Sequence, residues 1–201
     1  MEILPNINCH EDLLRLSEKK RTALCAEIRQ FLISSVSQTG GHLAGNLGVV
    51  ELTVALETVY DTAKDRLVFD VGHQSYVHKL LTGRRENFTT LRQFGGMSGF
   101  PKPEESITDA FVAGHASSAV SIALGMARAR TLQQKSYQVV ALMGDGAATG
   151  GMAYEQSFCD DITAYVGSLA PVLRFPGEEE MRSLAEGALR VLHGQAQPRE
   201  Y

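Results

Sequence analysis

The run YQVVALMGDG, residues 137–146, indicates the fold of the chain. Its first seven residues form a short, continuous, largely apolar run with two adjacent valines, which is typical of a strand buried inside a sheet. The strand is expected to end at the GDG of residues 144–146, because glycines on both sides of an aspartate favour a tight turn. A buried strand that leads directly into a polar turn indicates a parallel sheet covered by helices.

The segments around this strand fit the same architecture. The periodicity of apolar residues predicts helices over 11–37, 49–60 and 117–131, and LVFDV at 67–71 predicts a second buried strand. Residues 82–109 mix glycine, proline and charge, which predicts a long loop with one short helix. We therefore expect an α/β fold with a mainly parallel sheet and flanking helices.

The character of the sequence changes after Glu155. We expect a domain over residues 1–155 and a separate segment over 156–201 that has no recognisable strand. An amphipathic helix with an acidic first turn is predicted at 178–193 within that segment.

Composition excludes several classes of protein. The chain has 201 residues, with 19 lysines and arginines against 23 aspartates and glutamates, and without a basic stripe we expect no binding to nucleic acid or to an anionic membrane. Three scattered cysteines without CxxC spacing indicate reduced thiols rather than a disulfide framework or a zinc site. With no signal-like N-terminus and no apolar run near ~20 residues, we expect a soluble, cytoplasmic protein.

Glycine–histidine pairs suggest a ligand site. His42, His73 and His115 each directly follow a glycine, and His78 lies in the same stretch, where a turn is expected. On exposed, bent backbone an imidazole can donate to a phosphate or move a proton near neutral pH. Turn glycines beside ordinary polar histidines explain any one pair, but three pairs in one α/β domain favour a shared site. A metal cluster of histidines is poorly supported, because no cysteine or carboxylate accompanies them at ligand spacing.

Two further features suit an anion and a metal ion. Asp145 offers a hard oxygen ligand for a Mg²⁺ that bridges a diphosphate, and its neighbours Gly144 and Gly146 permit close approach of backbone N–H groups. Residues 114–118 begin an expected helix, whose free N–H groups and dipole suit an anion. An ordinary turn with a capping aspartate and an ordinary serine N-cap are the respective alternatives.

Basic residues offer a weaker candidate site. Arg84 and Arg85, near Lys79 and Lys102, are suited to holding a phosphorylated substrate, although a solvated loop charge explains each of them singly. Cys25 is expected in the core. The absence of GxxxxGK[ST] and GxGxxG motifs argues against P-loop and dinucleotide-binding proteins.

Five segments resemble, in the same order, the N-terminal domain of the 1-deoxy-D-xylulose-5-phosphate synthase family, thiamine-diphosphate enzymes of the transketolase superfamily. They are GGHLAGNLGVVELTVAL at 40–56, FDVGHQSYVHKLLTGR at 69–84, GGMSGFPK at 95–102, AGHASSAVSIALGMA at 113–127 and VVALMGDGAATGGMAYE at 139–155. The resemblance covers about residues 3–155 and implies the thiamine-diphosphate-binding fold of transketolase-type N-terminal domains.

The resemblance also implies a function. The family's transferases condense pyruvate with D-glyceraldehyde 3-phosphate to 1-deoxy-D-xylulose 5-phosphate and CO₂, using thiamine diphosphate and Mg²⁺. The product serves isoprenoid (terpenoid), thiamine and pyridoxal biosynthesis, and the resemblance implies a cytoplasmic homodimer.

Residue roles follow by resemblance. His42 would lie near the reacting carbon of the cofactor and assist proton transfers, and Asp145 would bind Mg²⁺. The residues that would contact the cofactor itself are His73, Gly114, His115, Ala116, Gly146 and Ala147.

The chain departs from the family after Glu155. The family's second Mg²⁺ ligand is an asparagine, yet this sequence has none after Asn87, and Asp160 and Asp161 come too early to replace it. The family's second domain carries the glutamate that activates the cofactor, and it is not recognisable here. We therefore expect a truncated, internally deleted or split enzyme, inactive or weakly active alone. The alternatives are one subunit of a split transketolase-like enzyme with a complementary chain, and a non-catalytic cofactor-binding remnant.

Overall fold

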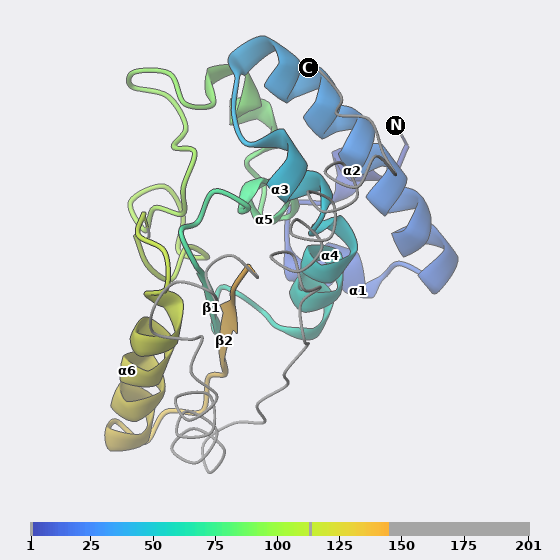
Figure 1. Ribbon diagram of the computed structural model, residues 1–201. Coiled ribbons are helices and arrows are strands. Elements are labelled where there is room, and N and C mark those ends of the chain that lie inside the picture. The colour runs from blue at the N-terminus through green and yellow to red at the C-terminus, as the bar shows by residue number, and fades with distance from the viewer. Residues whose placement is uncertain (1, 113, 145–201) are drawn as a thin grey trace, which may run out of the picture. The chain divides into compact units, whose positions relative to one another are not determined.

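A computed structural model describes residues 2–112 and 114–144 of the chain (Figure 1). These residues belong to one unit, Met1–Asp161. The expected turn at Asp145, Gly146 and Ala147 and the expected helix at 178–193 lie outside the described residues.

Helices dominate the first half of the described chain, and a pair of strands brings distant segments together. The elements are, in order, η1 (Leu4–Asn6), α1 (His10–Leu14), α2 (Glu18–Thr39), α3 (Leu43–Leu47), α4 (Val50–Val59), β1 (Arg66–Phe69), α5 (Tyr76–Leu81), η2 (Arg85–Thr90), α6 (Ala119–Leu132) and β2 (Val139–Leu142). The expected long loop with one short helix is confirmed, with η2 as that helix.

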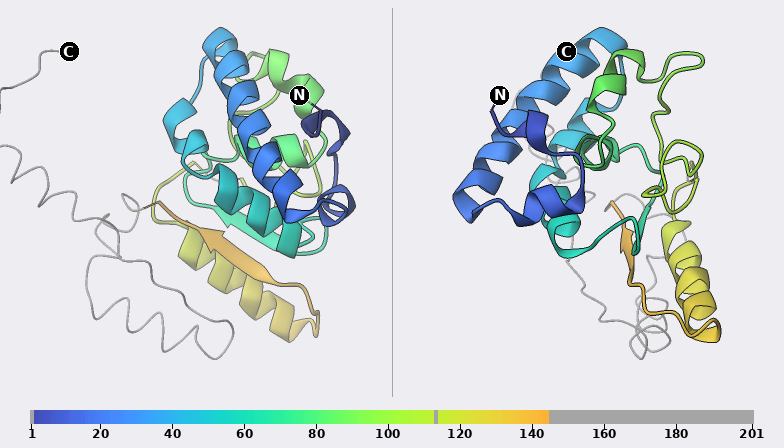
Figure 2. Two further views of the ribbon diagram at one scale, coloured as in Figure 1. Left: turned by 90° about the vertical axis from the view of Figure 1, so that its right-hand side faces the viewer. Right: turned by 180° about the vertical axis from the view of Figure 1, so that it is seen from behind.

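The two strands form a parallel pair, as the sequence predicts. Arg66 lies opposite Val139 and Phe69 lies opposite Leu142. Figures 1 and 2 show α6 on one side of the strands and α4 and α2 on the other, which is the helix–sheet–helix layering of an α/β fold.

The single helix predicted over 11–37 is wrong in one respect, because the structure divides it into α1 and α2. Ser17 has extended backbone, and its side-chain oxygen accepts the N–H of Lys20 at 3.4 Å. A serine N-cap satisfies an amide that the first turn of a helix leaves unpaired, so α2 begins at Glu18 instead of continuing α1.

The hydrophobic core lies among the helices. Leu24, Ile28 and Leu32 recur at helical spacing on α2, are buried, and belong to the same cluster as Tyr76 and Leu80 of α5. Cys25 is buried as expected. Fully burying a leucine or isoleucine side chain contributes roughly 1.5–3 kcal/mol, so each of these α2 side chains stabilises the fold appreciably.

The strands differ in burial. Leu67, Val68 and Phe69 of β1 are buried, whereas β2 is only partly buried and its Ala141 is exposed. The strand expected over 137–143 is therefore present as Val139–Leu142, but the expectation that it is buried is wrong, because β2 is only partly buried. Among the described elements, β1 and α6 pack most closely on β2, and the side chains that α6 buries are the small ones of Ala119 and Ala127. No helix within residues 2–112 and 114–144 is long and apolar enough to cross a membrane.

Candidate functional site

The structure brings His42 and His73 together. Their ring centroids are 5.1 Å apart and the rings are inclined at 64°, an edge-to-face arrangement. His42 is the residue before α3, and His73 lies in the turn between β1 and α5. His42 is exposed and His73 is half-buried, so a ligand can reach both imidazoles.

Glycines let the backbone approach this pair closely. Gly41 has a φ of +145°, and a Cβ added there would lie 2.8 Å from the hydroxyl oxygen of the buried Tyr76. A Cβ added at Gly45 would lie 3.3 Å from Nε2 of His73, so the His73 ring rests directly on the α3 backbone. Larger residues would separate the two histidine segments.

The environment of His73 favours the neutral imidazole. Partial burial lowers the pKa of His73, the neighbouring His42 lowers it further, and the nearby carboxylate of Asp70 partly offsets both. A neutral imidazole near pH 7 keeps one nitrogen as an acceptor and the other as a donor.

Asp70 joins β1 to the beginning of α6. Its carboxylate accepts the backbone N–H groups of Ser117 and Ser118 at 2.9 Å and of Ala119 at 3.0 Å. Val71, directly after Asp70, and Ser117 both have a positive φ, at 58° and 63°. Such backbone costs of order 1–3 kcal/mol for a non-glycine residue, and this strain lies on both sides of the Asp70 contact.

This contact corrects the anion site expected at 114–118. The N–H groups of Ser117 and Ser118 already have a carboxylate partner, which completes the cap of α6 from within the protein. Gly114, His115 and Ala116 are exposed, so this shorter stretch is the part that can face a ligand.

The end of β2, which precedes the expected metal turn in the sequence, lies beside the end of β1. The N–H of Asp70 donates to the carbonyl oxygen of Leu142 at 2.8 Å, which ties the ends of β1 and β2 together. Gly144, two residues after Leu142, is exposed, and apart from its chain neighbours no atom of the described residues lies within 4 Å of an added Cβ. Asp145, Gly146 and Ala147 lie outside the described residues.

Sequence reasoning missed several polar residues here. Gln74 donates from Nε2 to the carbonyl oxygen of Asp70 at 3.0 Å, while its Oε1 is buried and has no hydrogen-bond partner among the described residues. Within the same part of the chain, the buried hydroxyl of Ser75 also has no partner. The signal available in the sequence was their position directly after His73. In the structure, a buried polar atom without a partner beside a site suggests a missing ligand.

His78 does not lie in an exposed turn, contrary to the sequence prediction. It lies within α5 and is fully buried, with Nδ1 2.5 Å from Oε1 of Glu57 and Nε2 2.9 Å from Oδ1 of Asp109. Burial alone lowers the pKa of His78, but the two carboxylates outweigh it and raise the pKa. His78 is therefore a structural imidazolium within the fold.

Lys79 and Arg84 belong to the same buried network, so the phosphate-holding role suggested for them is wrong. Arg84 makes two hydrogen bonds to Asp109, at 2.7 and 2.8 Å, and Lys79 bonds Glu105 at 2.7 Å. The network contains three cations when His78 is protonated and three carboxylates. Its members are Glu57, His78, Lys79, Arg84, Glu105 and Asp109. This charge balance lets the ions lie in the interior.

The other two basic residues have separate environments. Arg85 pairs with the neighbouring Glu86. The backbone N–H of Lys102 donates to Asp109 at 2.6 Å, so this part of the long loop is held against the buried network.

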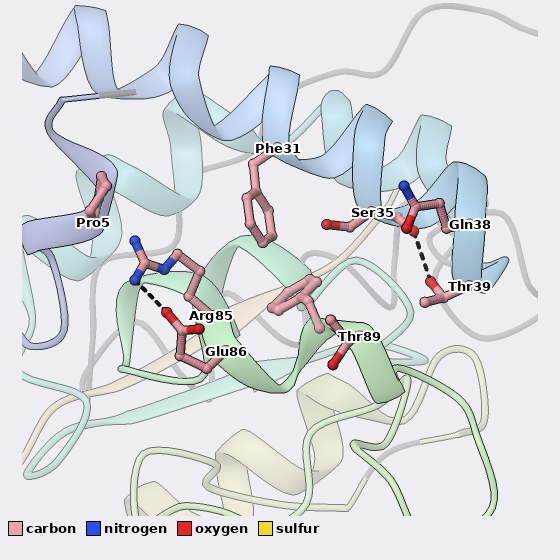
Figure 3. Close-up of a pocket in the computed structure, with 9 residues that line it drawn as sticks. Pro5, Phe31, Ser35, Gln38, Thr39, Arg85, Glu86 and Thr89 are labelled. Carbon is pink, nitrogen blue, oxygen red and sulfur yellow. Dashed lines mark hydrogen bonds and ion pairs between the residues drawn. The ribbon is translucent and has the colours of Figure 1, made fainter.

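The cavity in Figure 3 lies away from the histidine pair. It has a volume of about 270 Å³, lies between α2 and η2, and contains Phe31 and Phe88, whose ring centroids are 5.3 Å apart. Figure 3 shows Arg85 and Glu86 at one end and Gln38 and Thr39 at the other. Neither of the paired histidines lines it. Among the described residues, no group of three histidines, cysteines or carboxylates is arranged to hold a metal.

The chain is similar in sequence to a known family of proteins. Residues 4–161 match the family model described as 1-deoxy-D-xylulose-5-phosphate synthase, and the match extends beyond Glu155. Proteins of that name from Natranaerobius thermophilus and Syntrophomonas wolfei are each 61% identical over 154 residues, which is 77% of this chain and 24% of each relative. The one from Lachnoclostridium phytofermentans is 59% identical, over 77% of this chain and 25% of the relative. The chain thus spans about a quarter of the length of these curated relatives.

Proposed function

The chain belongs to the 1-deoxy-D-xylulose-5-phosphate synthase family, and on that basis we propose that it forms the diphosphate side of a thiamine diphosphate site. The reaction proposed for the whole enzyme is the condensation of pyruvate with D-glyceraldehyde 3-phosphate, a transferase step towards isoprenoid precursors in the cytoplasm. The observation that carries the proposal is the edge-to-face pair of His42 and His73 at the end of β1.

The described residues fit this cofactor in three respects. The exposed stretch 114–116 directly precedes residues 117–119, which Asp70 holds at the carboxyl end of β1, where parallel sheets bind their ligands. The half-buried His73 offers a neutral imidazole. The buried side-chain oxygens of Gln74 and Ser75, which have no hydrogen-bond partner within residues 2–112 and 114–144, follow it in the chain.

Each residue has a proposed role. Asp145 would hold Mg²⁺ by a carboxylate oxygen, with Gly146 and Ala147 against the diphosphate. Gly114, His115 and Ala116 would border the diphosphate and the thiazolium ring. When bound, thiamine diphosphate supplies a carbon nucleophile for the 2-oxo group of pyruvate and accepts the electron pair left by CO₂.

The two imidazoles would have different roles, one in orienting the cofactor and the other in proton transfer. His73 is held against the α3 backbone and would orient the cofactor through a hydrogen bond. His42 is exposed at the beginning of α3 and would move a proton at an oxygen of the substrate. Groups that act on the far side of the cofactor would come from a homodimer partner or from a complementary chain.

Calorimetric titration of the chain with thiamine diphosphate, with and without Mg²⁺, tests this proposal. We expect Mg²⁺-dependent binding that Asp145→Ala removes, because no other carboxylate of the sequence stands in a matching motif. Glu104→Ala, which removes an exposed loop carboxylate, is the control and should bind as the wild type does. Equal affinity in Asp145→Ala and the wild type would overturn the metal assignment. Pyruvate and glyceraldehyde 3-phosphate are expected to give no product with the chain alone.

A further inference from the structure

We propose that Asn46 is the positioning residue that fixes the distance and angle between the imidazoles of His42 and His73. This inference rests on the proposed function, because it assigns Asn46 a task within the same site. Asn46 lies on α3, one helical turn after His42, and its side chain is fully buried.

One amide group connects three segments of the site. Nδ2 of Asn46 donates to the carbonyl oxygen of His42 at 2.6 Å and to that of His73 at 2.8 Å. Its Oδ1 accepts the backbone N–H of Tyr76 at 2.8 Å. Both amide hydrogens and the carbonyl oxygen are therefore used within the protein.

The orientation of this amide follows from its partners. Two of them are carbonyl oxygens, which can only accept, and the third is a backbone N–H, which can only donate. Exchanging the nitrogen and oxygen of Asn46 would place its oxygen against two carbonyl oxygens and its NH₂ group against a backbone N–H. The side chain thus has one satisfactory orientation, and that orientation sets the spacing of the two histidine backbones.

Fixing the backbones of His42 and His73 also fixes the positions of their imidazole rings. The His73 ring lies on the backbone of Gly45, the residue before Asn46, and it also contacts the His42 ring edge to face. A second, longer link joins the N–H of His42 to the hydroxyl of Tyr76 at 3.4 Å. Asn46 provides the shorter bonds, so it should control the geometry more than Tyr76 does.

Few other residues can replace this side chain. Aspartate has nearly the same shape but presents only acceptors, so it opposes the carbonyl oxygens of His42 and His73. Glutamine is longer by one methylene and has no space in a fully buried position. Asn46→Asp is therefore the sharpest variant, because it keeps the volume and removes the two donated bonds.

Nuclear magnetic resonance of the cofactor-free chain, labelled at histidine, tests the proposal. Two observables are followed: the cross-peak between the ring protons of His42 and His73, and the pH midpoint of His73. His42→Gln and His73→Gln supply the assignments. In the wild type we expect the cross-peak and a His73 midpoint below that of free imidazole. In Asn46→Asp we expect the cross-peak to disappear and the midpoint to move by several tenths of a pH unit or more.

Two controls separate positioning from general loss of stability. Leu13→Ala opens a cavity in the core at α1 and should lower the thermal midpoint while leaving both observables unchanged. Tyr76→Phe removes only the longer link and should also keep the cross-peak. The proposal is overturned if folded Asn46→Asp keeps both observables, or if either control loses them to the same extent.

Measurements on the wild type keep the proposal testable if Asn46→Asp does not fold. The two Nδ2 protons of Asn46 should exchange with solvent at least tenfold more slowly than those of Asn87 in η2. Equal exchange rates would contradict the bonding described. Because no cofactor takes part, failure of this test is distinct from failure of cofactor binding.

Discussion

The carboxylate of Asp70 accepts the backbone N–H of Ser118 at 2.9 Å, although 48 residues of chain separate them. The same carboxylate accepts Ser117 and Ala119, so the beginning of α6 is held at the end of β1. Because His73 follows Asp70 by three residues and His115 precedes Ser118 by three, one buried side chain ties together two segments of the proposed site.

Replacing Asp70 by asparagine should destabilise the protein. The amide supplies one acceptor oxygen where the carboxylate has two, and its NH₂ group would oppose backbone N–H groups. Charge-assisted hydrogen bonds at a helix N-terminus are worth about 1–3 kcal/mol, so we expect a loss of that order in the free energy of unfolding. Urea denaturation measures it. Glu86→Gln, at an exposed ion pair, should change stability by less than about 1 kcal/mol, and an equal loss in both variants would contradict the role of Asp70.

Replacing both Arg84 and Asp109 should destabilise the protein by less than the sum of the two single replacements. Asp109→Asn leaves a buried guanidinium and a buried imidazolium without their shared carboxylate, and breaking such a network typically costs about 3–5 kcal/mol. The double variant Arg84→Met with Asp109→Asn removes both charges and should lose less than the sum of the losses in Arg84→Met and Asp109→Asn alone. Denaturation of all four proteins gives the coupling energy, and strict additivity would contradict a direct interaction.

Stability should fall as the pH rises above neutral, because of His78. The two carboxylates beside it raise the pKa of His78 despite its burial, so its contribution is complete below the unfolded value of about 6.5 and is lost as the pH passes the folded pKa. Burial tends to raise the pKa of Asp109, but His78 and Arg84 lower it overall. Its contribution is therefore complete above about pH 4 and is lost only as the pH falls towards the lower folded value.

These opposite signs predict a plateau of stability between about pH 4 and 6.5. Thermal unfolding across pH measures it. His78→Gln should flatten the decline on the alkaline side, whereas His115→Gln, at an exposed position, should not. A wild-type decline that persists unchanged in His78→Gln would exclude His78 as its source.

Gly41→Ala should disturb the histidine pair. The new methyl carbon would lie 2.8 Å from the hydroxyl of Tyr76, which is fully buried, and φ at this position is +145°. Overpacking of this kind typically costs about 1–3 kcal/mol. Gly125→Ala is the control, because it lies within α6 with nothing near the added carbon and should stabilise the helix by about 0.5–1 kcal/mol. Calorimetric unfolding distinguishes the two, and equal effects would argue against close packing at Gly41.

Local patterns predicted the strands, most of the helices and the residues of the histidine pair, because periodicity and glycine neighbours are readable from a few consecutive residues. The Asp70 cap and the Asn46 bonds to His73 and Tyr76 could not be predicted in this way, since these partners lie 27–49 residues away. His78 was misplaced for the same reason: Glu57 and Asp109, which make it a buried cation, are 21 and 31 residues distant. The division between α1 and α2 rested on a local serine cap that was overlooked within a continuous apolar period.

Competition calorimetry in the presence of Mg²⁺ tests the central claim most directly, namely that this chain recognises the diphosphate end of thiamine diphosphate. We predict that thiamine diphosphate binds, that inorganic diphosphate displaces it, and that unphosphorylated thiamine neither binds nor competes. Binding of thiamine with an affinity similar to that of thiamine diphosphate, or no binding of thiamine diphosphate at all, would contradict the account.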